Sequence, residues 1–118
     1  MNRKILEKRL INFAVLIVDM VDELSASKRS NHLLSQLVRS GTSPALNYAE
    51  AQSAESKKDF IHKMSLSLKE LRETLICLMI IQKSKKWRHN PALITAINEC
   101  DELVSIFVKS IQTAKKKG

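Results

Sequence analysis

The side chains best suited to chemistry in this sequence are three histidines and two cysteines, and their spacing favours neither a metal centre nor covalent catalysis. A metal centre in a helical bundle needs Glu-x-x-His pairs, whereas this chain offers only Asp59-x-x-His62. Cys77 and Cys100 stand inside apolar runs without CxxC spacing, so we expect reduced packing residues. His32 and His89 fall near expected helix ends or on polar faces, where a solvated imidazole is the simpler interpretation. We therefore expect a protein that is not an enzyme and holds no metal or cofactor.

A basic segment around one tryptophan is the best candidate for binding a polyanion. Its members are Lys83, Lys85, Lys86, Trp87 and Arg88. Cations neutralise phosphates, and an indole can stack on an unpaired base. Lys28 and Arg29 are expected in a turn at the same end of the fold, and the whole chain carries a formal net charge of +8. In the alternative interpretation, Trp87 covers the end of the fold and the lysines only keep the protein in solution.

Length and composition indicate a single helical domain over 1–118. A chain of 118 residues can bury enough surface to be stable without a metal or a disulfide. Two glycines and two prolines leave little material for hairpin turns. No apolar run approaches the roughly 20 residues of a membrane span, and the start lacks the apolar core of a signal peptide. We expect a cytoplasmic protein with no membrane partner.

Apolar residues recur at spacings of three and four, which predicts helices at about 4–24, 31–53 and 56–84, and a fourth from 91 to the C-terminal lysines. Ser56 and Asn90 are expected N-caps. The expected core stripes are Leu6, Leu10, Phe13, Ile17, Val21 and Leu24; Leu34, Val38, Gly41, Ala45, Tyr48 and Gln52; Phe60, Met64, Ser67 or Leu68, Leu71, Leu75, Leu78 and Gln82; and Ile97, Cys100, Val104, Phe107 and Ile111. Four such helices joined by short turns predict an all-α, up-down-up-down four-helix bundle.

The second expected helix contains two residues that a helix normally avoids, Gly41 and Pro44. An interior proline removes one backbone hydrogen bond and clashes with the carbonyl four residues back, at about 3 kcal/mol. Ser43 could instead cap a restarted helix. Because the apolar spacing continues without a slip, we predict one kinked helix. Its small residues Gly41, Ala45 and Ala49 are expected to let a neighbouring backbone approach closely.

Two further groups of residues predict an interface between copies of the chain. The first is apolar and lies off the core stripes of the first and third helices, so a single copy would leave it in water. The second is polar and shares one face of the second helix, roughly opposite its core stripe. The apolar group is Ile11, Val15, Val18, Leu66, Ile76 and Ile80, and the polar group is Arg39, Ser43, Asn47 and Glu50. A merely solvated face is the alternative for the polar group.

Three segments, 36–51, 56–60 and 67–74, together carry a pattern that resembles a known family. They read QLVRSGTSPALNYAEA, SKKDF and SLKELRET. The chain resembles the bacterial four-helix-bundle family named for proteins encoded in 23S rRNA intervening sequences, although many members have glycine at the position of Ala51. The resemblance implies an up-and-down bundle that commonly assembles as a homopentamer. It also implies a distant relationship to the accessory protein of diversity-generating retroelements, which works with a reverse transcriptase and nucleic acid.

The resemblance carries more about assembly than about mechanism, because most members of the family have no established activity. Its motif places Asn and Glu at Asn47 and Glu50, which supports the hypothesis of a polar network between protomers. Two functions stay open. One is a homo-oligomeric adaptor that associates with RNA or DNA and, by the distant relationship, with a protein such as a reverse transcriptase. The other is a protein-interaction scaffold that binds no nucleic acid.

Overall fold

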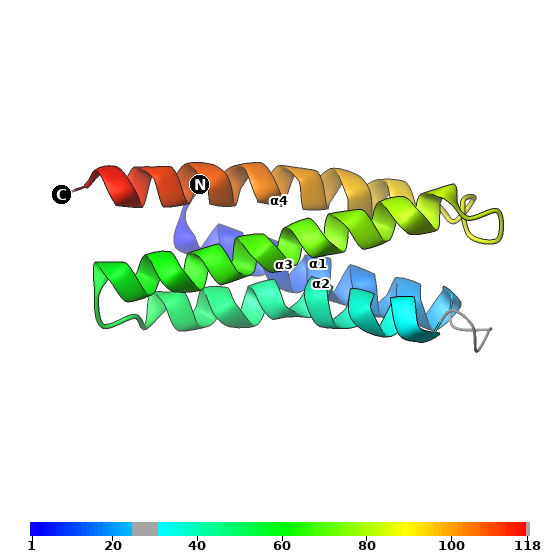
Figure 1. The fold of residues 1–118 in the computed structure, drawn as a ribbon, viewed down its shortest axis with the longest axis horizontal. Coiled ribbons are helices and arrows are strands. Elements are labelled where there is room, and N and C mark those ends of the chain that lie inside the picture. Colours follow the sequence, from blue (N-terminus) through cyan, green and yellow to red (C-terminus); the bar gives the residue numbers. More distant parts are fainter. Residues whose placement is uncertain (25–30, 118) are drawn as a thin grey trace.

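The computed structural model describes residues 1–24 and 31–117, which form four antiparallel helices (Figure 1). Their bounds are α1 Arg3–Leu24, α2 Asn31–Gln52, α3 Lys57–Lys83 and α4 Pro91–Lys116. Each helix reverses the direction of the one before it, in a body about 49 Å long and 21 by 20 Å across. The predicted all-α four-helix bundle is therefore confirmed.

Side-chain caps explain where α3 and α4 begin. Ser56 Oγ accepts a hydrogen bond from the Asp59 amide at 3.0 Å, and Asn90 Oδ1 accepts one from the Ala92 amide at 2.9 Å. Each bond satisfies a backbone donor that has no partner within its own helix. Both predicted caps are confirmed. Asn2 plays the same role at α1, where it accepts from the Ile5 amide at 2.9 Å.

The interior stripe of α3 differs from the expected one in its second half. The helix buries Met64, Ser67, Leu71, Thr74, Leu78 and Ile81, at alternating spacings of three and four. Gln82 is exposed, so its predicted place in the core was wrong, and Leu75 is only half-buried. The apolar pattern favoured Leu75 over its polar neighbour Thr74. Thr74 can occupy the core because its hydroxyl is hydrogen-bonded there, as described below.

In the other helices too, the buried residue is often the one that precedes the expected residue in the sequence. Residues buried beyond the expected stripes include Met20, Leu37, Ala51, Leu93, Ala96 and Leu103. The expected Val21, Val38, Ala45, Gln52, Ile97 and Val104 are half-buried instead. Each helix packs against two neighbours, so its buried face is broader than one stripe of apolar residues.

The helix α2 continues without interruption through Gly41 and Pro44. A Cβ atom on Gly41 would lie 3.0 Å from both Cγ1 and Cγ2 of Ile17, so α1 packs here against bare backbone. The predicted close approach is confirmed at Gly41, whereas Ala49 is exposed and takes no part in it. The carbonyl of buried Pro44 accepts a hydrogen bond from Ser67 Oγ at 3.2 Å. One continuous helix is therefore confirmed, and the bend at Pro44 stays a prediction.

Neighbouring helices pack in a closed ring, α1 on α2, α2 on α3, α3 on α4 and α4 on α1, and the α1–α4 seam is the least extensive. Arg9 crosses this seam and pairs with Glu99 at 2.5 Å and Glu102 at 3.0 Å. The hydrogen bond that Arg9 donates to Glu99 is the main cause that raises the pKa of Arg9. A charged bridge thus joins the two helices where apolar packing is thinnest.

Candidate nucleic-acid and assembly surfaces

The α3–α4 connection, residues 84–90, is a compact turn that presents its cations to solvent. The amide of Arg88 donates to the Ser84 carbonyl at 3.0 Å, and the amide of Asn90 donates to the Trp87 carbonyl at 3.0 Å. The side chain of Asn90 also donates to Glu23 of α1 at 3.3 Å, which fixes the turn to the end of the bundle. Among the described residues, the exposed cations in and beside this turn are Lys83, Lys85, Lys86 and Arg88. We call these four residues the basic turn.

The ring of Trp87 is not exposed as base stacking requires. Its side chain is only 9% exposed and belongs to the hydrophobic core cluster. The ammonium of Lys86 lies 5.7 Å from the centroid of its ring, over one face. Stacking needs an open ring face, so the predicted stacking role is wrong and Trp87 covers the end of the core. Lys28 and Arg29, the other residues predicted for this end, lie outside the described residues.

The basic turn differs from the flanks of the bundle in its charge pairing. On the flanks, Arg9, Arg39 and Lys63 all pair with carboxylates at distances of 2.5 to 3.1 Å. Within the part of the chain that the structure describes, no carboxylate pairs with any cation of the basic turn. Unpaired cations keep counterions that a polyanion can release on binding. Cations also gather at the opposite end of the bundle, where α1 and α3 begin. There Lys57 donates a hydrogen bond to the Lys117 carbonyl.

The two charged members of the polar group of α2, Arg39 and Glu50, contact α3 across the seam between the helices, and Ser43 and Asn47 are half-buried. Arg39 pairs with Glu70 and Glu73 of α3, each at 2.9 Å, and these carboxylates raise the pKa of its guanidinium. Glu50 accepts from Lys63 of α3 at 3.1 Å. The Ser43 hydroxyl donates to the Arg39 carbonyl at 2.7 Å, inside the same helix. The charged members therefore have partners within one chain, and the polar network between protomers through Asn47 and Glu50 stays a prediction.

A buried hydroxyl cluster joins α2 and α3 beneath this seam. Thr74 Oγ1 lies 2.9 Å from Ser40 Oγ and 2.8 Å from the Glu70 carbonyl oxygen. Thr74 is fully buried and Ser40 is 1% exposed. Neither residue belongs to the core stripes predicted from the sequence. The signal that could have found them is their spacing of three from the buried Leu37 and Leu71.

The predicted apolar group is largely open to solvent in a single copy of the chain. Val15 is 53% exposed on α1 and Ile76 is 57% exposed on α3. Ile11, Val18 and Ile80 are exposed as well, and Leu66 is half-buried. Met79, Ile94 and Leu46 are exposed apolar residues that the prediction did not include. Large apolar side chains repeated along an outward helix face are typical of a protein contact surface.

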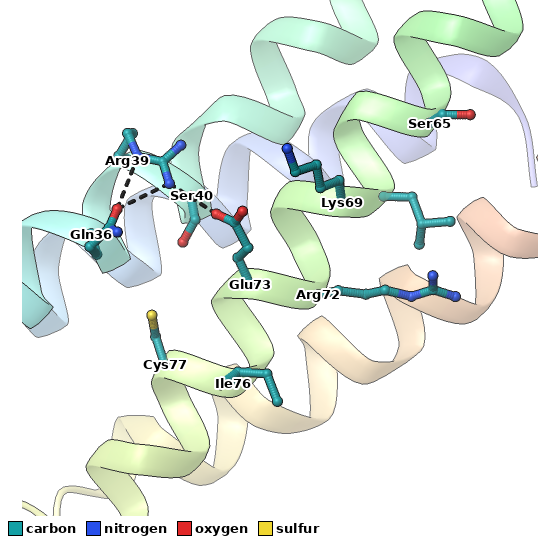
Figure 2. A pocket seen from close by; sticks show the side chains of 10 residues that line it. Gln36, Arg39, Ser40, Ser65, Lys69, Arg72, Glu73, Ile76 and Cys77 are labelled. Carbon is teal, nitrogen blue, oxygen red and sulfur yellow. Dashed lines mark hydrogen bonds and ion pairs between the residues drawn. The ribbon is translucent and has the colours of Figure 1, made fainter.

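A hollow of about 700 Å³ lies beside these residues on α3 (Figure 2). Glu73 points from α3 toward Arg39 of α2, whereas Arg72 extends toward the other side of α3. Ile76 and Cys77 line the same hollow one turn further along the helix. The hollow combines an ion-paired edge with an exposed apolar side chain. Such a surface is able to receive the side chains of a neighbouring helix.

Two kinds of site find no support in the described residues. Nowhere in 1–24 and 31–117 do three or more His, Cys, Asp or Glu side chains group so that they could hold a metal ion. No helix in these same ranges is long and apolar enough to cross a bilayer.

Both cysteines are free thiols, with Cys77 half-buried and Cys100 buried. Burial raises the pKa of Cys100 to about 12. A thiol with such a pKa is protonated and unreactive at neutral pH.

Comparison with known proteins agrees with this architecture. A family model described as 23S rRNA-intervening sequence protein matches residues 4–109. Among solved structures, the chain is similar to a protein of unknown function from the S23 ribosomal protein family of Bacteroides thetaiotaomicron, with 28% identity and a TM-score of 0.85. The alignment covers 95% of this chain and 99% of that one. No curated protein matches the sequence significantly.

Proposed function

The chain belongs to the 23S rRNA-intervening sequence protein family, and from this premise we propose that it is a non-enzymatic, homo-oligomeric adaptor that binds RNA or DNA through its basic turn. The observation that carries the proposal is the set of four exposed cations at one end of the bundle, none paired with a carboxylate of the described residues. Such cations favour phosphate contact without base recognition. The buried Trp87 fits this class of contact, because it leaves no ring free to read bases.

Assembly supports the binding proposal through repetition. In a closed ring, every copy would present its basic turn on the same face, and weak contacts to one long polyanion would add up. The exposed apolar residues of α1 and α3 would be covered by neighbouring copies. A homopentamer is the assembly that we favour, and it rests on the resemblance of the chain to its family.

Nucleic-acid binding is tested with a triple variant, Lys85→Ala/Lys86→Ala/Arg88→Ala. We expect its binding to a fluorescent single-stranded RNA to weaken, and the slope of log K against log salt to become shallower by about two to three. The matched control is Lys4→Ala/Lys8→Ala/Lys58→Ala, which removes the same charge from exposed positions away from the basic turn. If both variants weaken binding equally, overall charge rather than the basic turn is responsible and the assignment is wrong.

Assembly is tested by light scattering after size exclusion. We expect the parent chain to give a multiple of 13.4 kDa, with five favoured, and Ile76→Glu/Ile80→Glu to give a smaller particle. Ile94→Glu is the control, because Ile94 is exposed on α4, a helix that supplies no residue of the predicted interface. A parent chain that stays monomeric at micromolar concentration contradicts the assembly.

The second candidate function is a protein-interaction scaffold. The observation that favours it is the exposed apolar surface of α1 and α3 together with a tryptophan that is unavailable for stacking. This function predicts no RNA or DNA binding at low salt and a specific protein partner. An electrophoretic shift with total RNA at two salt concentrations separates the two functions, since only the adaptor gives a salt-sensitive shift.

A further inference from the structure

The end of the bundle opposite the basic turn contains a hollow of about 600 Å³ with walls from all four helices. It exists because α1 begins inward of the other helix ends, as Figure 1 shows. Tyr48 marks the level at which α1 begins, because its hydroxyl lies 3.5 Å from the carbonyl oxygen of Arg3. The ring of Tyr48 also contacts the ring of Phe107 in α4. Beyond Phe107, α4 continues as far as Lys116. A hollow of this size is in the range of small-molecule sites.

The inner wall of this hollow is apolar. Leu6, Tyr48 and Met64 are buried members of the core, and Phe60 and Ile106 are half-buried beside them. The half-buried side chains keep apolar surface in contact with water. An alkyl chain placed along this wall would remove that surface from water, which is favourable.

The rim of the hollow is polar and positively charged. Arg3, Lys109 and Lys117 line it, and no lining residue is acidic. Across the described ranges, none of the three cations forms an ion pair with a carboxylate. Burial is the main cause that raises the pKa of Tyr48, with Glu7 raising it and Arg3 lowering it, so its hydroxyl keeps its proton. Among the described residues, that hydroxyl has only the long 3.5 Å contact to the Arg3 carbonyl, so it can donate to a ligand instead.

We propose that this hollow binds a medium-chain fatty carboxylate. The alkyl chain lies along Leu6, Phe60 and Met64, and the carboxylate lies at the rim between Arg3 and Lys109. Two carboxylate oxygens can accept charge-assisted hydrogen bonds from both cations. A neutral alcohol lacks the charge that the rim attracts, and an alkyl ammonium is repelled by it. The site is independent of nucleic-acid binding, because the basic turn lies at the other end of the bundle.

Methionine methyl groups provide a direct probe of this site. Met1 and Met64 line the hollow, whereas Met20 and Met79 do not. In a spectrum of the ¹³C-methyl-methionine protein, decanoate below its micelle concentration should shift the Met64 signal saturably and leave the Met79 signal in place. Decyltrimethylammonium, with the opposite charge, should produce no saturable shift. The proposal is overturned if Met64 does not respond to decanoate, if both chain types shift it equally, or if Met79 shifts in parallel.

Variants of the rim complete the test. Arg3→Gln/Lys109→Gln should weaken decanoate binding about tenfold or more, because charge-assisted hydrogen bonds are lost. Lys8→Gln/Lys58→Gln makes the same charge change at exposed positions that do not line the hollow, and should bind decanoate like the parent. All four positions are exposed, and circular dichroism confirms that the variants fold. Equal affinity of the rim variant and the parent would refute the site, whatever the outcome of the RNA experiment.

Discussion

Thr74→Val offers a test of the hydroxyl cluster that joins α2 and α3. Valine keeps the shape of threonine but removes the hydroxyl. The Thr74 hydroxyl has one proton to donate, and its oxygen lies within hydrogen-bond distance of both Ser40 Oγ and the Glu70 carbonyl oxygen. Without that hydroxyl, Ser40 keeps only a 3.5 Å contact to the Leu37 carbonyl while 1% exposed. We expect Thr74→Val to lower the free energy of unfolding by about 1–3 kcal/mol, the penalty for a buried polar group without a good partner.

Replacing Ser40 and Thr74 together should destabilise the fold less than the sum of the two single substitutions. Ser40→Ala leaves Thr74 bonded to the Glu70 carbonyl and improves helix propensity, so it should cost about 1 kcal/mol or less. Ser40→Ala/Thr74→Val removes both hydroxyls and leaves no orphaned group. We expect a loss of about 1 kcal/mol for the pair, and therefore a coupling energy of about 1–2 kcal/mol.

Urea unfolding followed by circular dichroism measures all four proteins. The same protein concentration must be used throughout, because dissociation of an oligomer would add a concentration-dependent contribution. Additive single and double variants would refute the hydroxyl coupling. A double variant less stable than Thr74→Val would show that volume, not hydrogen bonding, controls this layer.

Three further predictions follow from the packing and from the thiols. Gly41→Val should destabilise the fold by about 1–3 kcal/mol, because its side chain would collide with Ile17; Ala49→Val, at an exposed position of the same helix, is the control in urea unfolding. Iodoacetamide at pH 8 should modify Cys77 in the native protein but modify Cys100 only in urea, as measured by mass spectrometry of peptides. Modification of Cys100 in the native protein would contradict its burial. Since burial raises the pKa of Cys100 from 9.0 to about 12, its contribution to stability is complete below pH 9 and lost as the pH rises toward 12. Cys100→Ala should therefore lose stability less steeply over that range than the parent does, and equal slopes would contradict this.

The sequence was sufficient for the helices because their limits depend on local chemistry. Ser56, Asn90 and Pro91 act on the backbone next to them, so their effect can be inferred without knowing the neighbours. The inward stripes were less predictable. Thr74 is buried for a reason that involves another helix, since a hydroxyl of α2 makes a buried threonine acceptable.

The surfaces were predicted unevenly for the same reason. Exposure of Val15 and Ile76 follows from helical spacing alone, and the structure agrees. The partners of Arg39 and Glu50 lie on another helix, α3, so spacing within α2 could not identify them. Trp87 shows the converse case, because composition suggested an exposed aromatic among cations, whereas its burial depends on how the turn folds back over the core.

The thin α1–α4 seam has a consequence for how the chain folds and opens. Three of the four helix contacts join consecutive helices, so two adjoining helical hairpins can form through local encounters before the ends meet. Closure of α1 on α4 brings together the most distant parts of the sequence and contributes the least packing. The first excursion of the native state should therefore be separation along this seam, with Arg9 released from Glu99. Amide hydrogens of α1 would then exchange with solvent earlier than those of the α2–α3 hairpin.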